Sequence, residues 1–253
     1  MLQARDSFRD GVRFSSAKLT MRNAASAIPD CASPPMVVGT VSTATKLAEL
    51  SAGGKIEADI VEIRMDLCGH EEMDWEESFR ALKGAGAQLL LTLRHKDEGG
   101  TWDGSPLERT ELLRSLLPFA CAVDVEIGTG GLGPMHDVAE ECDTCLIGSF
   151  HDFEKTPSVD ELNKVIEIGF ANGADLVKIA TLTETEPDVE NLATLLRRNR
   201  ELPLAVLGMG TLGPETRVQF PRIGSRLTYG YLDESAAPGQ IFAGELQKKL
   251  SIP

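Results

Sequence analysis

The sequence of 253 residues lacks any apolar run that approaches the roughly 18 residues of a membrane-spanning helix. Its N-terminal segment has no apolar stretch before a small-residue cleavage site, which a secretory signal would have. Basic residues are also scarce, because 25 Lys and Arg oppose 39 Asp and Glu and leave a net charge of −14. A charge of this sign repels phosphate backbones and anionic lipid. We therefore expect a cytoplasmic protein that binds neither nucleic acid nor membrane.

A disulfide framework is absent as well. The chain has five cysteines, an odd number, and they are spread widely: Cys31, Cys68, Cys121, Cys142 and Cys145. Cys142 and Cys145 form a CxxC, but it leads into an apolar run instead of opening a helix, and neither a second CxxC nor a pair of histidines accompanies it. The pattern favours a reducing compartment and disfavours a redox or zinc site.

The chain also lacks a long linker between residues 36 and 253, so we expect one domain there. Eight apolar, β-branched runs begin 23 to 34 residues apart: 36–41, 59–67, 88–94, 122–128, 145–150, 174–180, 202–210 and 226–232. Helical patterns repeat apolar residues at three or four in the intervals 45–50, 75–82, 107–117, 159–170 and 189–196. Strand and helix alternating eight times indicate a (β/α)8 TIM barrel.

Some local features complete this prediction. Thr156 is expected to cap the helix over 159–170, with Pro157 at its first position. Residues 1–17 mix charges without a period and predict a disordered extension, and residues 18–35 predict a short hairpin that closes the bottom of the barrel in an 18–253 domain. A doubly wound sheet is the alternative fold. The run GTGGLG (128–133) could be its phosphate loop, but we interpret it as a turn, because no long helix is expected after it and no acidic residue ends a strand about 20 positions later.

Charged side chains gather where the predicted strands end, which is where barrel enzymes carry their chemistry. Glu62 and Arg64 are two residues apart and therefore share the inner face of one strand. Lys178 interrupts the buried run DLVKIA, and His151 follows the preceding strand. Burial and nearby cations lower the pKa of a lysine, and the free amine that results attacks carbonyl groups to form a Schiff base. Taken singly, each of these residues also fits a structural role; together, at one end of the barrel, they predict an active site.

Six motifs carry a resemblance to a known family. They are EIRMDL (62–67), LRHKDEGG (93–100), SFHDFEKTP (149–157), DLVKIA (175–180), MGTLGPETR (209–217) and APGQI (237–241). In order and spacing they resemble type I 3-dehydroquinate dehydratase of the shikimate pathway, over about residues 18 to 253. Each motif alone is weak, whereas six in order on eight predicted strands are specific.

The resemblance implies an activity and a role for each matching residue. Lys178 would form an imine with the ketone of 3-dehydroquinate, His151 would transfer protons, and Glu98 would orient that histidine. Arg217 would bind the substrate carboxylate, and the remaining binding residues would be Glu62, Arg64, Arg94, Ser235, Ala236 and Gln240. The family also implies a homodimer, and neither a metal nor an organic cofactor.

One departure and two rival functions follow from the same residues. Many relatives carry serine where this chain has Ala236, with a serine displaced to Ser235, so a hydroxyl of the lid is expected to be missing and the Michaelis constant raised. Another Schiff-base barrel, a class I aldolase or transaldolase, would share the lysine chemistry, and a non-catalytic paralogue would only bind a cyclic polyol acid. Arg217 and the His151–Glu98 pair favour dehydration over the aldolase, and the presence of Lys178, His151 and Glu98 disfavours the non-catalytic paralogue. The sequence does not distinguish a biosynthetic from a quinate-degrading role.

Overall fold

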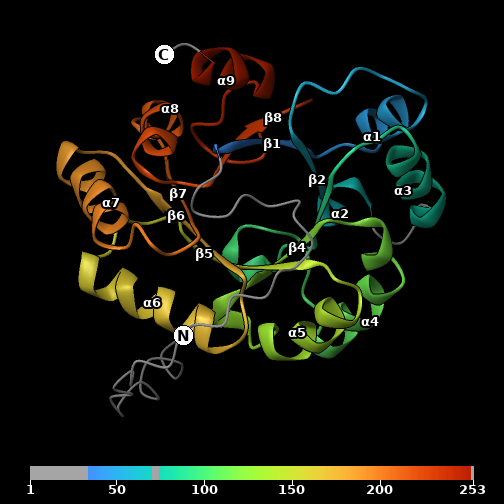
Figure 1. Cartoon of the computed structure of the whole chain (residues 1–253), viewed down its shortest axis with the longest axis horizontal. Helices are drawn as coiled ribbons and strands as arrows, with labels where there is room; N and C mark the ends of the chain where they lie inside the picture. The colour runs from blue at the N-terminus through green and yellow to red at the C-terminus, as the bar shows by residue number, and fades with distance from the viewer. Residues whose placement is uncertain (1–33, 70–73, 252–253) are drawn as a thin grey trace.

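The structure, a computed structural model, describes residues 34–69 and 74–251. The extension predicted over 1–17 and nearly all of the hairpin predicted over 18–35 therefore lie outside the described residues. The described part forms one barrel with helices around it (Figure 1). None of its helices is long and apolar enough to cross a membrane.

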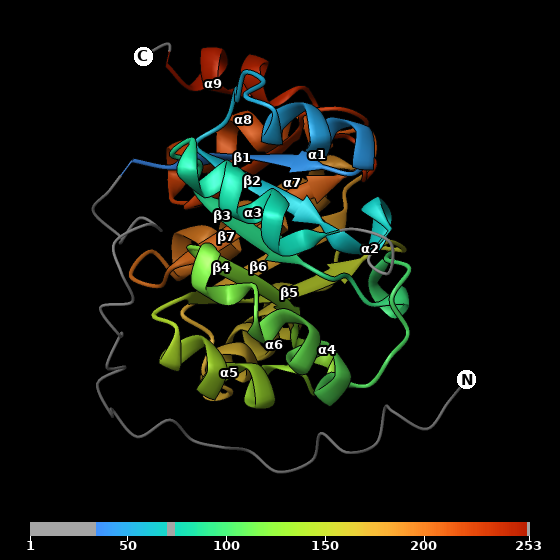
Figure 2. The ribbon, with the colours of Figure 1, turned by 90° about the vertical axis from the view of Figure 1, so that its right-hand side faces the viewer.

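Eight parallel strands form the barrel wall and confirm the predicted (β/α)8 architecture. They are β1 (Met36–Val41), β2 (Ile60–Arg64), β3 (Leu89–Thr92), β4 (Ala122–Glu126), β5 (Cys145–Asp152), β6 (Leu176–Leu182), β7 (Leu204–Met209) and β8 (Leu227–Tyr231). Their spatial order, β7-β6-β5-β4-β3-β2-β1-β8, brings the last strand beside the first, and in Figure 2 the strand arrows point the same way. This order excludes a doubly wound sheet, whose strands would not follow the sequence around a ring.

Strand β8 contacts its two neighbours, β1 and β7, in different ways. Strand β8 pairs with β1 over five register positions, from Met36 to Thr40, and the Asp233 carboxylate beyond β8 accepts hydrogen bonds from the backbone and hydroxyl groups of Ser42 and Thr43 beyond β1. Between β7 and β8 the closure is looser among the described residues. The Arg226 amide donates to the Leu204 carbonyl at 2.7 Å, and the Ser225 hydroxyl accepts from the Val206 amide at 2.9 Å.

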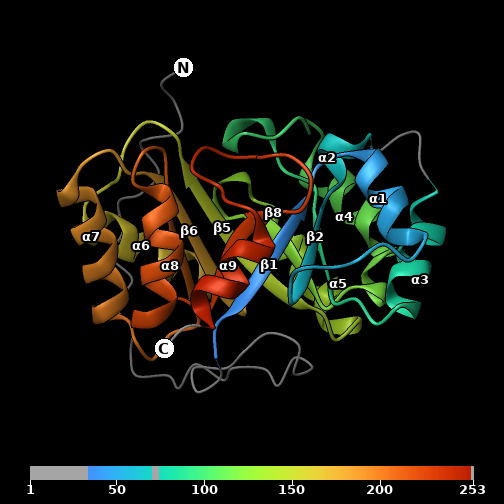
Figure 3. The same cartoon turned by 90° about the horizontal axis from the view of Figure 1, so that it is seen from above.

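The helices form an outer layer around the strands (Figure 3). They are α1 (Ala44–Ser51), α2 (Met65–Cys68), α3 (Trp75–Gly84), α4 (Pro106–Arg114), α5 (Leu132–Glu141), α6 (Val159–Ala171), α7 (Glu186–Arg198), α8 (Gly213–Ile223) and α9 (Ala243–Leu250), with short 3-10 segments η1 (Lys96–Glu98), η2 (Leu117–Phe119) and η3 (Ile127–Thr129). Apolar faces of these helices pack on the outward side chains of the strands, as Phe79 and Leu82 of α3 do.

Two local predictions are wrong. Helix α6 is capped by Ser158, because Ser158 and Glu161 form a reciprocal capping box, while the Thr156 hydroxyl donates to the Leu182 carbonyl at 2.6 Å. The expectation that no long helix follows the run GTGGLG is also wrong. The ten-residue helix α5 begins at Leu132 and forms because Leu132, Met135 and Val138 bury one face.

Alternation along the strands divides the barrel interior into an apolar floor and a polar upper part. The floor holds inward side chains from every strand: Val38, Ile60, Leu90, Ala122, Ile147, Leu176, Ala205 and Leu227. Two residues further along several strands, the inward positions become polar, at Thr40, Glu62, Thr92, Asp124, Ser149 and Lys178. Because parallel strands end at the same side of the barrel, these groups converge at its carboxyl end.

Candidate active site

A pocket opens at the carboxyl end of the barrel, and nearly all of the predicted site residues line it. Those that do are Glu62, Arg64, Arg94, Glu98, His151, Lys178, Arg217, Ala236 and Gln240. Ser235 is not among the lining residues; it is exposed, and its hydroxyl donates to the Ala237 carbonyl at 2.8 Å. Strand ends supply most of the others, so the barrel itself positions them.

Lys178 lies in β6 with 5% of its surface exposed, and two groups surround its amine. Nζ is 3.2 Å from Oδ2 of Asp124 and 4.2 Å from the centroid of the Tyr229 ring. The amine therefore lies between a carboxylate and the face of an aromatic ring. Sequence reasoning missed Asp124, although its position two residues before Glu126 on the same strand placed it on the inner face.

Asp124 is held in a fully buried network of charges. Its Oδ1 accepts from the Ser149 hydroxyl at 2.6 Å and pairs with Nη1 of Arg94 at 2.9 Å. Burial raises the pKa of the Asp124 carboxyl, but Arg94 and Lys178 outweigh burial and hold that pKa well below its usual range. Asp124 is therefore a permanent anion beside the lysine.

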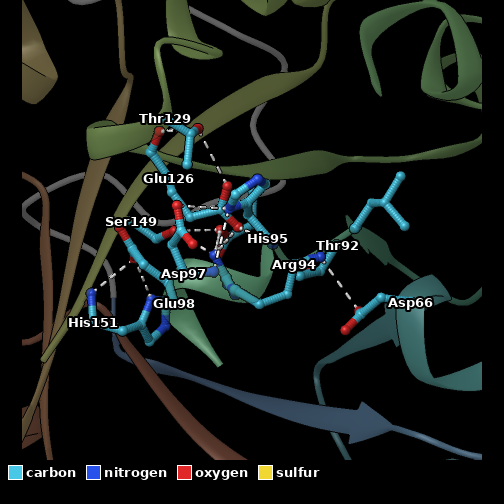
Figure 4. Close-up of polar contacts among 12 residues, drawn as sticks. Asp66, Thr92, Arg94, His95, Asp97, Glu98, Glu126, Thr129, Ser149 and His151 are labelled. Atoms are coloured by element: carbon cyan, nitrogen blue, oxygen red, sulfur yellow. Dashed lines mark hydrogen bonds and ion pairs between the residues drawn. The ribbon is translucent and has the colours of Figure 1, made fainter. Parts of the chain in front are cut away.

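Arg94 contacts two acids through its Nη1. Besides Asp124, its Nη1 lies 2.9 Å from Oε1 of Glu126 and 2.7 Å from the Ser149 hydroxyl, and Figure 4 shows the guanidinium directed at these groups. Burial opposes its charge, but the carboxylates of Asp124 and Glu126 raise the pKa of Arg94 well above its ordinary value. Arg94 thus lines the pocket and also neutralises the carboxylates of Asp124 and Glu126 in the barrel wall.

His151 and Glu98 form a hydrogen-bonded pair. Nδ1 of His151 is 2.9 Å from Oε2 of Glu98, and the same oxygen accepts the His151 backbone amide at 2.9 Å (Figure 4). Burial, opposed by Arg94 and assisted by Glu126, raises the pKa of Glu98 to about 8. Burial and the cations of Arg94 and Lys178 lower the pKa of His151 well below its ordinary value. Near pH 7 the pair consists of a carboxylic acid and a neutral imidazole, and both groups can move a proton.

Glu62 and Arg64 lie on the same inner face of β2, each fixed by neighbours. Glu62 accepts hydrogen bonds from the hydroxyls of Thr40 and Thr92 at 2.7 and 2.9 Å. Arg64 makes two hydrogen bonds to the Asp66 carboxylate, at 2.8 and 2.7 Å. These contacts hold a carboxylate and a guanidinium in place at the pocket wall, where they can bind hydroxyl groups.

Arg217 is a buried cation on α8 that keeps one nitrogen unused. Its Nε donates to the Gly239 carbonyl at 2.9 Å and its Nη1 to the Tyr229 carbonyl at 3.0 Å, whereas Nη2 has no hydrogen-bond partner among the described residues. Burial lowers the pKa of Arg217 to about 10, which leaves it charged at neutral pH. A buried guanidinium without an anion is suited to a carboxylate ligand.

The loop between β8 and α9 covers part of the pocket. In Figure 3 this loop lies at the same end of the barrel as α2. Within it, Oε1 of Gln240 accepts the Ala236 amide at 2.8 Å, and the Gly210 amide donates to the Pro238 carbonyl at 3.3 Å. With the contact of Arg217 to Gly239, these bonds hold the loop against the barrel end.

Comparisons with known proteins identify the family. The model of the family described as type I 3-dehydroquinase matches residues 36–253. The 3-dehydroquinate dehydratase of Methanocella arvoryzae is 35% identical over 219 residues, which cover 87% of this chain and 97% of the relative. That of Methanosarcina barkeri is 37% identical over 209 residues, covering 78% and 86%.

Solved structures agree. The 3-dehydroquinate dehydratase of Geobacillus kaustophilus superposes with a TM-score of 0.76 at 27% identity, covering 86% of this chain and 90% of that one. The type I enzyme of Clostridium difficile, solved with covalently modified comenic acid, gives a TM-score of 0.77 at 26% identity, with coverage of 87% and 92%. The chain therefore belongs to the type I 3-dehydroquinase family and is a hydro-lyase of the 3-dehydroquinate dehydratase kind.

Proposed function

We propose that the chain dehydrates 3-dehydroquinate to 3-dehydroshikimate through an imine on Lys178. The observation that carries this proposal is the buried Lys178 amine in one pocket with the His151–Glu98 pair. The related Clostridium difficile enzyme was solved with a covalently modified ligand, which agrees with covalent chemistry in the family. No other reaction is favoured by a specific observation in this pocket.

The imine makes a weakly acidic carbon usable. Once the amine of Lys178 has lost a proton, it attacks the C3 carbonyl, and loss of water leaves a protonated imine. When the C2 proton is removed, the C–H electron pair forms a C2=C3 double bond while the C=N pair moves onto the nitrogen, which gives a neutral enamine. The enamine then expels the C1 hydroxyl, which leaves as water with one added proton, and hydrolysis of the product imine restores the amine. Asp124 stays charged beside Nζ and stabilises the cationic imine.

His151 takes the C2 proton in this proposal and Glu98 sets its tautomer. When Glu98 is ionised, Nδ1–H donates to it and Nε2 offers a lone pair, so His151 acts as a base. When Glu98 is protonated, its proton lies on the carboxyl, Nδ1 accepts, and Nε2 carries the hydrogen needed for an acid. Because the pKa of Glu98 is about 8, the two forms are close in energy near neutral pH.

Substrate binding is assigned to the groups around this centre. The free Nη2 of Arg217 would bind the carboxylate, while Glu62 and Arg64 would hold ring hydroxyls. Ala236 and Gln240 would contact the substrate from the loop after β8, and Ser235 contributes no hydroxyl to the pocket. Arg94 would act from the wall, through the network that it shares with Asp124. The homodimer and the cytoplasmic location stay predictions.

Borohydride trapping tests the proposal. The enzyme is incubated with 3-dehydroquinate and sodium borohydride, digested, and analysed by peptide mass spectrometry. We expect a reduced adduct on the peptide that contains Lys178, its loss in Lys178→Met, and its retention in Lys164→Met, which changes an exposed lysine on α6. Dehydration by folded Lys178→Met at the wild-type rate would overturn the imine mechanism, and a retro-aldol fragment would indicate an aldolase.

A further inference from the structure

Arg109 is a buried cation that the proposed reaction does not use. It belongs to α4, in the outer layer of helices, yet only 2% of its surface is exposed. Its Nη1 pairs with a carboxylate oxygen of Glu126, and its Nη2 donates to the Thr129 hydroxyl at 2.9 Å. Arg109 thus places a positive charge behind the barrel wall.

The contacts of Glu126 connect Arg109 to the pocket. The other oxygen of Glu126 lies 2.9 Å from Nη1 of Arg94, and Arg94 lies 2.9 Å from Asp124. Asp124 in turn is 3.2 Å from Nζ of Lys178. Charges of alternating sign therefore run without a gap from the outer helix to the reactive amine.

The glycine-rich turn 128–133 leaves room for this arrangement. A Cβ atom at Gly131 would lie 2.3 Å from Nη2 of Arg109 and 2.9 Å from the Val125 side chain. Gly133, in the first turn of α5, has nothing within 4 Å of its Cβ position. The turn therefore accommodates a guanidinium instead of a phosphate, and Gly131 is the position where a side chain is excluded.

We propose that Arg109 is a positioning residue for the reaction: by neutralising Glu126 from outside the barrel, it keeps Arg94 on Asp124 and limits the negative field on the His151–Glu98 pair. The inference rests on the proposed function, because it takes this pair as the proton-transfer group. Helix α4 would then influence the reaction through Arg109 although none of its residues lines the pocket.

The proposal predicts opposite effects of two neutralising substitutions. The groups that act on Glu98 are Arg94 from the end of β3, Asp124 and Glu126 from β4, and the His151 amide from β5. Apart from burial, the carboxylates raise the pKa of Glu98 and Arg94 lowers it. Loss of Arg109 leaves Glu126 with the guanidinium of Arg94 alone, so more of its negative charge acts on Glu98 and the pKa of Glu98 rises. Loss of the charge of Glu126 lowers it.

The test is the pH dependence of kcat/KM from pH 6 to 10 for the full chain. Because the basic form of His151 needs ionised Glu98, kcat/KM should rise with pH, and the midpoint of this rise should lie near the pKa of Glu98. We call this rise the limb of the pH profile. A unit charge about 10 Å away, at an effective dielectric constant of about 20, moves a pKa by about one pH unit. We expect Arg109→Met to move the limb up by about that amount, Glu126→Gln to move it down, and the double variant to lie within about 0.3 pH unit of wild type.

Conservative and steric variants separate positioning from folding. Arg109→Lys should restore most of the limb, and Gly131→Ala should shift it in the direction of Arg109→Met, while Gly133→Ala leaves it in place. If Arg109→Met does not fold, Glu126→Gln and Gly131→Ala, which are expected to move the limb in opposite directions, still decide the matter. The proposal would be overturned if folded Arg109→Met, Glu126→Gln or Gly131→Ala kept the limb within about 0.2 pH unit of wild type, or if Arg109→Met and Glu126→Gln shifted it in the same direction. Failure of the proposed function would appear differently, as a wild-type enzyme without a borohydride adduct on Lys178.

Discussion

Glu98 makes folding less favourable as the pH rises, and Glu98→Gln should remove this effect. Its pKa is about 8 in the folded chain against an ordinary value of 4.5, because burial penalises the carboxylate. The folded state therefore holds its proton longer than the unfolded state, and stability falls as the pH rises from about 4.5 to about 8. The pKa difference of 3.5 between the folded and unfolded chain lowers the free energy of unfolding by about 5 kcal/mol over the whole pH window. Between pH 7 and 8 the loss is about 1 kcal/mol.

The assay is urea unfolding of wild type and Glu98→Gln at pH 7 and pH 8. The raised thiol pKa values of Cys68 and Cys121 lower the stability of both proteins alike as the pH increases, so the difference between the proteins isolates Glu98. Wild type should lose about 1 kcal/mol more than the variant over this interval. Equal losses would show that Glu98 is already ionised at pH 7 and would remove the proton-sharing pair from the mechanism.

Four further substitutions test the surrounding contacts. Asp124→Asn removes the anion from beside the buried Lys178 amine and leaves Arg94 with Glu126 alone, so it should lower the free energy of unfolding by about 3–5 kcal/mol in urea. A loss below about 1 kcal/mol would contradict the network. Arg217→Met should raise KM about 10- to 150-fold, because a charge-assisted hydrogen bond contributes about 1.5–3 kcal/mol, and a fall in kcat alone would contradict a carboxylate-binding role. Steady-state kinetics should show no change in Ser235→Ala, whereas Ala236→Ser should lower KM up to about tenfold; an increase in KM would show that a hydroxyl there is not useful.

Strand periodicity predicted much of the fold and the inner face of the site. Apolar runs bounded by turns gave all eight strands, because a strand covered on both faces needs a continuous apolar sequence. The same alternation placed Glu62, Arg64 and Lys178 inside the barrel. It could also have found Asp124, since the spacing that turns Glu126 inward applies equally to the residue two positions earlier.

Contacts made by long side chains across elements were not predictable in the same way. An arginine on an amphipathic helix is normally a surface residue, and nothing in the local pattern shows that Arg109 reaches Glu126 through the space left at Gly131. Cap positions depend on side-chain geometry too: Thr156 and Ser158 both suit an N-cap, and only the reciprocal bond with Glu161 distinguishes them. The sequence predicted most of the charged residues that line the pocket, but not which charges oppose one another inside it.

The way β8 joins the barrel sets an order on its formation during synthesis. The strand pairs with β1, and the Asp233 carboxylate reaches Ser42, 191 residues earlier, so both contacts must wait until the last strand has left the ribosome. Until then β1 is an open edge able to pair with other chains. A nascent chain of this protein should therefore be most prone to aggregation just before its final strand is made, and binding of a chaperone to β1 should cease once β8 is in place.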